Sequence, residues 1–82
     1  MRRTYSYPFL RMTISNRIRI LRFEKRMTQE ELAVRTGVSR QTIMSKENGH
    51  TNPSVLLAFK IAKALDTAIV DVFQTEGKLL PV

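Results

Sequence analysis

The sequence predicts an all-α fold, a compact bundle of about five short helices, and three observations carry this prediction. Apolar residues recur at helical spacing, as in Ile14, Ile18 and Leu21. Residues that commonly cap or end helices divide the middle of the chain into short segments, with Thr28 and Gly37 as the clearest examples. The chain has 82 residues, enough for one small domain with a small core.

The first two helices are expected on either side of a short break. The first is expected over residues 15–25, where the apolar stripe faces the core. The second is expected over residues 29–36, because Thr28 can cap it and Glu31, three residues later, can complete a capping box. Both are short helices whose stability depends on packing against the rest of the bundle.

The third helix is expected over residues 40–48, with Ser39 as its N-cap. Gly37 lies in the turn before it, where a chain that leaves a helix often needs a positive φ. The small side chain of Ala33 lets the second and third helices cross closely at a steep angle. This arrangement is a helix-turn-helix, whose second helix can enter the major groove of DNA. The inward-facing residues of the motif are expected to be Leu32, Ala33 and Ile43.

The fourth helix is expected to begin at Pro53, a favoured first helical residue, with Asn52 as its cap. It should run to about residue 65, and a fifth short helix over residues 68–73 should close the bundle. The residues expected to face inward on the fourth helix are Val55, Phe59, Ala62 and Leu65.

The domain organisation predicted from the sequence has three parts. Residues 1–11 show no helical period and form an N-terminal appendage, residues 12–75 form the folded domain, and residues 76–82 form a loose tail. One hypothesis is that translation starts at Met12, which makes residues 1–11 upstream sequence. The alternative is a basic arm that reaches along the DNA backbone or into the minor groove.

The composition restricts the class of protein and its partners. The net charge of +7 lies within residues 1–26, which carry eight Lys or Arg and one acidic residue. Such a basic end favours a polyanion, either nucleic acid or an anionic membrane surface, although it could also be a solvated face. The absence of cysteine excludes a disulfide framework and a thiolate metal site, and no apolar run approaches the ~20 residues of a membrane span. We therefore expect a cytoplasmic protein, associated with the nucleoid when bound to DNA, and no cofactor, metal or membrane partner.

One pattern in the chain resembles a known family. Gln29, Ala33, Gly37 and Ile43 have the spacing Q-x3-A-x3-G-x5-I and are followed by Glu-Asn-Gly and Asn-Pro-Ser. This pattern resembles the phage repressor and Cro type of helix-turn-helix, the xenobiotic-response-element group of bacterial regulators. The resemblance covers roughly residues 13–73 and implies a lambda-repressor-like DNA-binding domain. The alternative is an ordinary helical hairpin.

The third helix is expected to read DNA bases. Arg40 can donate two hydrogen bonds to guanine O6 and N7, and Gln41 can pair with adenine N6 and N7. One turn later, Met44 could contact a thymine methyl group and Ser45 could donate or accept a hydrogen bond. The resemblance implies the same positions. The alternative is that these are simply exposed helix residues.

The resemblance also implies phosphate contacts and an ion pair. Gln29 lies at the start of the second helix, where free N–H groups attract anions. Arg22 and Glu47 match a partly buried ion pair that orients the reading helix in phage repressors. The remaining phosphate-binding positions that the resemblance implies are Ser39, Thr42 and Asn48.

The chain departs from the family pattern at three places. Lys46 occupies a position usually held by Ile or Leu, so its stem should reach to the surface or the reading helix should sit differently. Arg26 and Asp66 each replace a glycine common at helix ends, which costs backbone strain if φ remains positive. Ala68 replaces a Ser or Thr cap, for which Thr67 could substitute.

Apolar residues stand at four positions where relatives often carry charges, namely Ile20, Phe23, Leu56 and Val70. Exposed apolar groups often mark an interface. We expect a homodimer formed through the C-terminal helices, which would read the two half-sites of a palindromic operator about 34 Å apart. The alternative is that these side chains cover one another within a monomer.

The function predicted from the sequence is a sequence-specific, double-stranded DNA-binding transcriptional regulator, and the family habit favours a repressor. The alternative is an antitoxin or protein-interaction module that binds a partner protein as well as its own operator. An enzyme is not expected, because one histidine and no cysteine leave little for a catalytic triad or a metal site.

Overall fold

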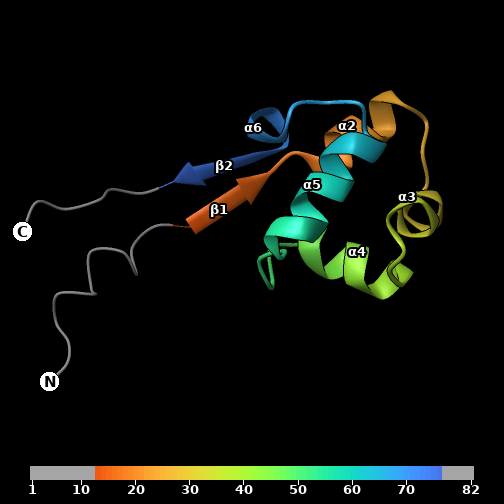
Figure 1. Cartoon of the computed structure of the whole chain (residues 1–82), viewed down its shortest axis with the longest axis horizontal. Coiled ribbons are helices and arrows are strands. Elements are labelled where there is room, and N and C mark those ends of the chain that lie inside the picture. The colour runs from red at the N-terminus through yellow and green to blue at the C-terminus, as the bar shows by residue number, and fades with distance from the viewer. Residues whose placement is uncertain (1–12, 77–82) are drawn as a thin grey trace, which may run out of the picture.

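The computed structural model describes residues 13–76 and contains five helices with a two-stranded antiparallel sheet (Figure 1). The all-α class and the predicted number of helices are confirmed, while the small sheet was not predicted. The appendage predicted at residues 1–11 lies outside the described residues, as does the tail from residue 77 onward. In chain order the elements are β1 (Thr13–Asn16), α2 (Ile18–Glu24), α3 (Gln29–Thr36), α4 (Arg40–Glu47), α5 (Val55–Ala64), α6 (Ile69–Val72) and β2 (Phe73–Glu76).

Helix α3 has the predicted bounds and the predicted capping box. Thr28 Oγ1 accepts a hydrogen bond from the Glu31 amide at 3.0 Å, and the Thr28 amide donates to Glu31 Oε1 at 2.8 Å. This backbone donor, with the Thr28 side chain, lowers the pKa of the Glu31 carboxyl below its ordinary value. Gly37 ends the helix at φ +73°, where a Cβ would be strained, so the predicted need for glycine in this turn is confirmed.

The start of α2 differs from the prediction. The helix begins at Ile18 rather than at residue 15, because residues 13–16 form β1 and pair antiparallel with β2. The Ile18 amide donates to Asn16 Oδ1 at 3.0 Å, which provides the first helical turn with a side-chain acceptor. Ile14 therefore lies on an exposed strand, and its predicted place in the core stripe is wrong.

Helix α5 begins two residues later than predicted and turns a different face inward. Ser54 Oγ, rather than Asn52, provides the cap by accepting from the Leu57 amide at 3.1 Å, and Pro53 precedes the helix. Val55 and Phe59 are 74% and 55% exposed, so their predicted burial is wrong. The buried residues of α5 are Leu57, Ala58, Ile61 and Ala62.

Three further details concern the ends of helices and the end of the domain. Asp66 and Arg26 both adopt the positive φ expected of the glycines they replace, at 53° and 54°. Ala68 is the N-cap of α6 and has no side-chain cap, because Thr67 Oγ1 donates to the Leu65 carbonyl instead. The predicted substitute cap is therefore wrong. The strand β2 continues to Glu76, where the sequence had predicted the start of a tail.

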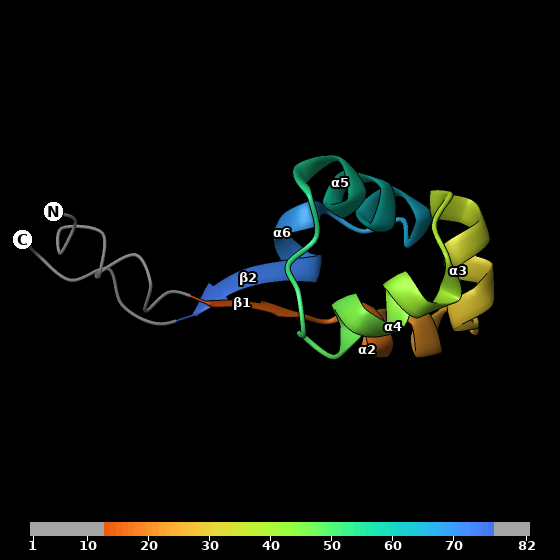
Figure 2. The same ribbon diagram turned by 90° about the horizontal axis from the view of Figure 1, so that it is seen from below.

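A single apolar core joins the five helices. In Figure 2, α5 lies across the body from α2 and α4, α3 closes one end, and the β1–β2 ribbon projects from the other. None of the helices in residues 13–76 is long and apolar enough to cross a bilayer. The buried residues that form this core cluster are Ile18, Leu21, Met27, Leu32, Ala33, Ile43, Leu57, Ile61, Ala62, Leu65 and Val72.

Candidate nucleic-acid interface

The N-terminal end of α4 is open to solvent. Ser39 Oγ caps the helix by accepting from the Thr42 amide at 3.1 Å, and it lies 2.9 Å from Thr42 Oγ1. Arg40 and Gln41 follow this cap with exposed side chains. Ile43 is the buried residue of α4 that fastens the helix to the core. The first turn of α4 therefore presents a guanidinium and an amide outward, both able to reach a partner beyond the domain.

One turn further along α4, the candidate base-reading residues are less exposed. Met44 and Ser45 are half-buried, and Ser45 Oγ lies 3.2 Å from Thr51 Oγ1 in the loop after the helix. The Lys46 ammonium donates to the same Thr51 hydroxyl at 2.7 Å. Lys46 thus brings its charge to the surface along a half-buried stem, which resolves how a lysine is accommodated at this position.

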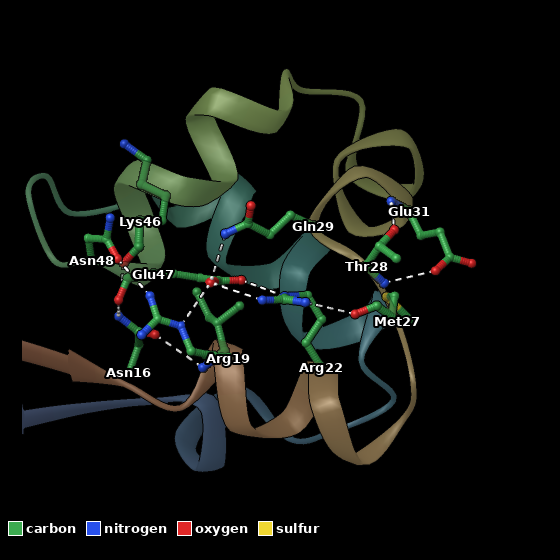
Figure 3. A network of polar contacts seen from close by, with 11 residues as sticks. Asn16, Arg19, Arg22, Met27, Thr28, Gln29, Glu31, Lys46, Glu47 and Asn48 are labelled. Carbon is green, nitrogen blue, oxygen red and sulfur yellow. Dashed lines mark hydrogen bonds and ion pairs between the residues drawn. The ribbon is translucent and has the colours of Figure 1, made fainter.

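The C-terminal end of α4 is held by a polar network centred on Glu47 (Figure 3). Arg22 Nε, from α2, donates to Glu47 Oε2 at 2.6 Å, and a second guanidinium nitrogen donates to Oε1 at 3.2 Å. Gln29 Nε2, from α3, donates to the same Oε1 at 3.2 Å, and Arg19 Nε does so at 3.4 Å. One carboxylate therefore joins three helices.

The Arg22–Glu47 pair at the centre of the network is buried, which makes it energetically sensitive, whereas the Arg19 side chain is 53% exposed. The Glu47 side chain has no exposed surface and that of Arg22 is 7% exposed. Burial alone would raise the pKa of Glu47, but the hydrogen bonds from Arg22, Gln29 and Arg19 and the charge of Arg22 lower it overall. Arg22 is further satisfied by the Met27 carbonyl at 2.9 Å. Removing one partner from such a pair leaves an uncompensated charge.

All four residues expected to bind phosphate have partners within the domain, and Ser39 and Thr42 contact each other as described above. The Gln29 amide donates to Glu47, and Asn48 Oδ1 accepts from an Arg19 guanidinium nitrogen at 2.7 Å. A side-chain amide has two N–H donors, so Gln29 keeps one donor for a further acceptor and Asn48 keeps both. Both side chains are thus oriented by the protein and still able to donate outward.

Sequence reasoning missed Asn16. Its Nδ2 donates to the carbonyl of Lys46 at 2.9 Å and lies 3.5 Å from the carbonyl of Glu47, while its Oδ1 accepts from the Ile18 amide. Asn16 therefore ties the start of α2 to the end of α4 (Figure 3). The available signal was an asparagine at the second position of the helix predicted over residues 15–25, a residue type that commonly caps helices and so favours a later start.

A shallow hollow of about 380 Å³ lies between the starts of α3 and α4. Positive groups from Arg22 and Arg40 border it, together with the first residues of α3, whose free N–H groups favour anions. Glu30 adds one negative charge at its rim. The arrangement suits a polyanion that passes this edge. In residues 13–76 no cluster of three metal-ligating side chains is present.

Comparisons with known sequences agree on one family. A family model described as helix-turn-helix matches residues 18–72. The chain is similar to an uncharacterised HTH-type transcriptional regulator from Archaeoglobus fulgidus, with 51% identity over 57 residues, 70% of this chain and 80% of the relative. It is also similar to an uncharacterised HTH-type transcriptional regulator from Methanocaldococcus jannaschii, with 47% identity over 60 residues, 73% of this chain and 91% of the relative.

Comparison with solved structures supports the same fold. A crystal structure of a protein from Bacteroides fragilis matches with a TM-score of 0.70 at 27% identity, covering 76% of this chain and all of that chain. The restriction-modification controller protein C.AhdI from Aeromonas hydrophila matches with a TM-score of 0.63 at 35% identity, covering 66% of this chain and 82% of that chain.

Proposed function

This chain belongs to the Cro/C1-type helix-turn-helix family, and from that premise we propose that it represses transcription by reading double-stranded DNA in the major groove with α4. At the coarser level it is a transcriptional regulator with a helix-turn-helix DNA-binding domain. The proposal adds the mode of reading, the sign of regulation, the half-site geometry and a location in the cytoplasm on the nucleoid.

The observation that carries the proposal is the exposed first turn of α4. Arg40 and Gln41 follow the Ser39 cap with solvent-facing side chains. Arginine pairs with two acceptors of guanine, and glutamine pairs with the donor and acceptor of adenine. We assign base reading to Arg40 and Gln41 first. Met44 and Ser45 can add contacts only at the edge of the groove, since both are half-buried.

Phosphate contacts would fix the register of α4 without reading sequence. Gln29 and Asn48 are already oriented by Glu47 and Arg19, and each retains a free N–H donor. Ser39 and Thr42, at the start of α4, are the other two proposed phosphate ligands. In this scheme the Arg22–Glu47 pair does not contact bases; it positions α4 so that the four ligands line one edge.

We further propose that two copies bind one palindromic operator. Large apolar side chains are exposed on α5 at Leu56 and on α6 at Val70, with two more on α2 at Ile20 and Phe23. A dimer through the C-terminal helices would cover Leu56 and Val70 and place two α4 helices one DNA turn apart, about 34 Å. Light scattering at high concentration tests this, and a monomeric mass would contradict the dimer.

The second candidate function is an antitoxin or interaction module that binds a partner protein as well as its operator. The same exposed apolar side chains favour it. Co-purification with a small protein encoded beside it would support this reading, whereas tight operator binding by the protein alone supports the first.

Selection of bound duplexes from a random DNA pool tests the reading mode. We expect the full chain to select a two-fold-related sequence. Arg40→Ala and Gln41→Ala should each weaken binding by about 1–3 kcal/mol and relax the preference at particular base pairs. Arg35→Ala, at an exposed arginine on α3, is the matched control and should leave the preference unchanged. Failure to enrich any duplex, even in dilute buffer, would refute the proposal.

A further inference from the structure

A second hollow lies at the other end of α3, between that helix and α5. It has a volume of about 450 Å³. It shares no lining residue with the hollow beside α4, which involves only the first residues of α3. Along α3 the nearest lining residues of the two hollows, Glu30 and Val34, are four positions apart, about 6 Å along the helix axis. We call this second hollow the α3–α5 groove; its lining residues are Val34, Arg35, Thr36, Gly37, Lys60, Lys63 and Ala64.

The α3–α5 groove combines an apolar floor with a positive rim. Val34 is 76% exposed, and the half-buried Ala64 also lines the groove. Arg35, Lys60 and Lys63 are exposed around this floor, and no carboxylate lines the groove. Within residues 13–76 none of the three cations has a carboxylate within 4.0 Å.

We propose that this groove binds an acidic segment of another protein, which places a large apolar side chain on Val34 and carboxylates against the rim. Charge complementarity selects this occupant. A DNA backbone would gain nothing from the apolar floor. A second copy related by a two-fold axis would bring the same three cations against one another. This surface lies apart from the proposed DNA-reading edge, so the inference does not depend on α4 reading bases.

The geometry defines what the segment should contain. Lys60 and Lys63 are three residues apart on α5, so their Cβ atoms are about 5–6 Å apart on one face. Two acidic residues at similar helical spacing, with an apolar residue on the same face, would match them. An amphipathic acidic helix laid along a groove is a known mode of recognition between proteins. Such a contact would let a partner bind while α4 remains free.

Selection from a random dodecapeptide display library on the immobilised full-length protein tests the proposal. We expect enriched peptides with net negative charge and at least one large apolar residue. Their affinity should fall about tenfold on Lys60→Glu/Lys63→Glu, since two attractions become repulsions. Lys60→Ala/Lys63→Ala should give a smaller loss in the same direction. Lys63→Glu alone should also lower the affinity. Its matched control is Lys25→Glu, at an exposed lysine outside the groove, and this control should keep full affinity.

Four results would overturn the proposal. The first is no enrichment, or enrichment of peptides without net negative charge. The second is equal peptide affinity for the double reversal variant and the parent, with both shown to be folded by thermal melting. The third is that the double reversal variant loses as much affinity for a random-sequence duplex as Arg40→Ala does, which would make the groove a nucleic-acid surface. The fourth is a change of oligomeric mass in the double variant, which would make the occupant a second copy.

Discussion

The two ends of α4 differ in how they are held. At the C-terminal end, Glu47 accepts hydrogen bonds from three side chains of two other helices, and Asn16 donates to a carbonyl of the last turn. At the N-terminal end Ser39 caps the helix and Ile43 packs into the core, while the side chains of Arg40 and Gln41 extend into solvent. One end is held by side-chain contacts and the other is presented to solvent, so the orientation of α4 and the base reading that we propose depend on different residues.

This division also explains why a charged group is buried in so small a domain. A buried ion pair often contributes little net stability compared with apolar residues of the same size, but it tolerates few alternative arrangements. Glu47 must receive donors from α2 and α3 together, so α4 can satisfy it in one orientation. The comparison between the two ends predicts that substitutions at the C-terminal end have the larger effect on stability, whereas those at the N-terminal end change the base preference of DNA binding.

The largest expected effect is that of Glu47→Ala on unfolding. Removing the carboxylate leaves the Arg22 guanidinium buried without its partner, so we expect a loss of about 3–5 kcal/mol in the free energy of unfolding. Glu30→Ala, at an exposed glutamate on α3, is the control and should change it by less than about 0.5 kcal/mol. Urea denaturation measures both, and equal losses would contradict the comparison.

A smaller effect on stability is expected from pH, because the charge of Glu47 supplies only part of what Glu47→Ala removes. The pKa of Glu47 is lowered in the fold from an ordinary value of 4.5, so its ionised form stabilises the protein. The contribution is fully present above about pH 4.5 and is lost as pH falls through the lower pKa of the folded state. The stability advantage of the parent over Glu47→Gln should therefore shrink in acid. A constant difference between pH 7 and pH 3 would show that the charge has no such role.

Next in size is Asn16→Ala. It removes the hydrogen bond to the Lys46 carbonyl and the acceptor for the Ile18 amide, and we expect a loss of about 1–2 kcal/mol in unfolding free energy. Operator binding should weaken equally for matched and mismatched sequences, because α4 is less firmly held while its reading residues are intact. Ser15→Ala, at the neighbouring strand residue, is the control. A changed base preference in Asn16→Ala would sink this assignment.

The smallest expected effect on stability is that of Arg40→Ala and Gln41→Ala. Both side chains are exposed, so each variant should unfold within about 0.5 kcal/mol of the parent although its DNA binding falls. Thermal melting of the free proteins measures this. A large destabilisation by either variant would show that the N-terminal end of α4 is structural as well, and would break the distinction between the two ends.

The part of the fold that sequence reasoning predicted best is governed by local chemistry. The bounds of α3, its capping box and the positive φ of Gly37 depend on residues within a few positions of one another. The β1–β2 ribbon was missed because its partners, such as Asn16 and Phe73, are far apart in the chain and each strand has only four residues. Such short strands carry too little alternation to predict a sheet.

The predicted burial pattern of α5 was wrong for a related reason. The sequence VLLAFKIAKA has apolar residues on two faces of the helix. The prediction placed the face with Val55 and Phe59 inward, whereas the face with Leu57 and Ile61 is the buried one. In the candidate site, the resemblance to known regulators pointed to Arg22 and Glu47. It gave no indication that Gln29 would share the same carboxylate, because that contact requires three helices to converge at one point.

The pairing of Thr13 with Glu76 gives the molecule a single stem. Both ends of the described fold leave through it, on the side opposite α3 (Figure 1). A tether, a fused domain or a solid support joined to the chain there would hang from one attachment point and leave α4 unobstructed. A pull on that stem would be shared between β1, which reaches the last turn of α4 through the Asn16 amide, and β2, which continues directly from α6.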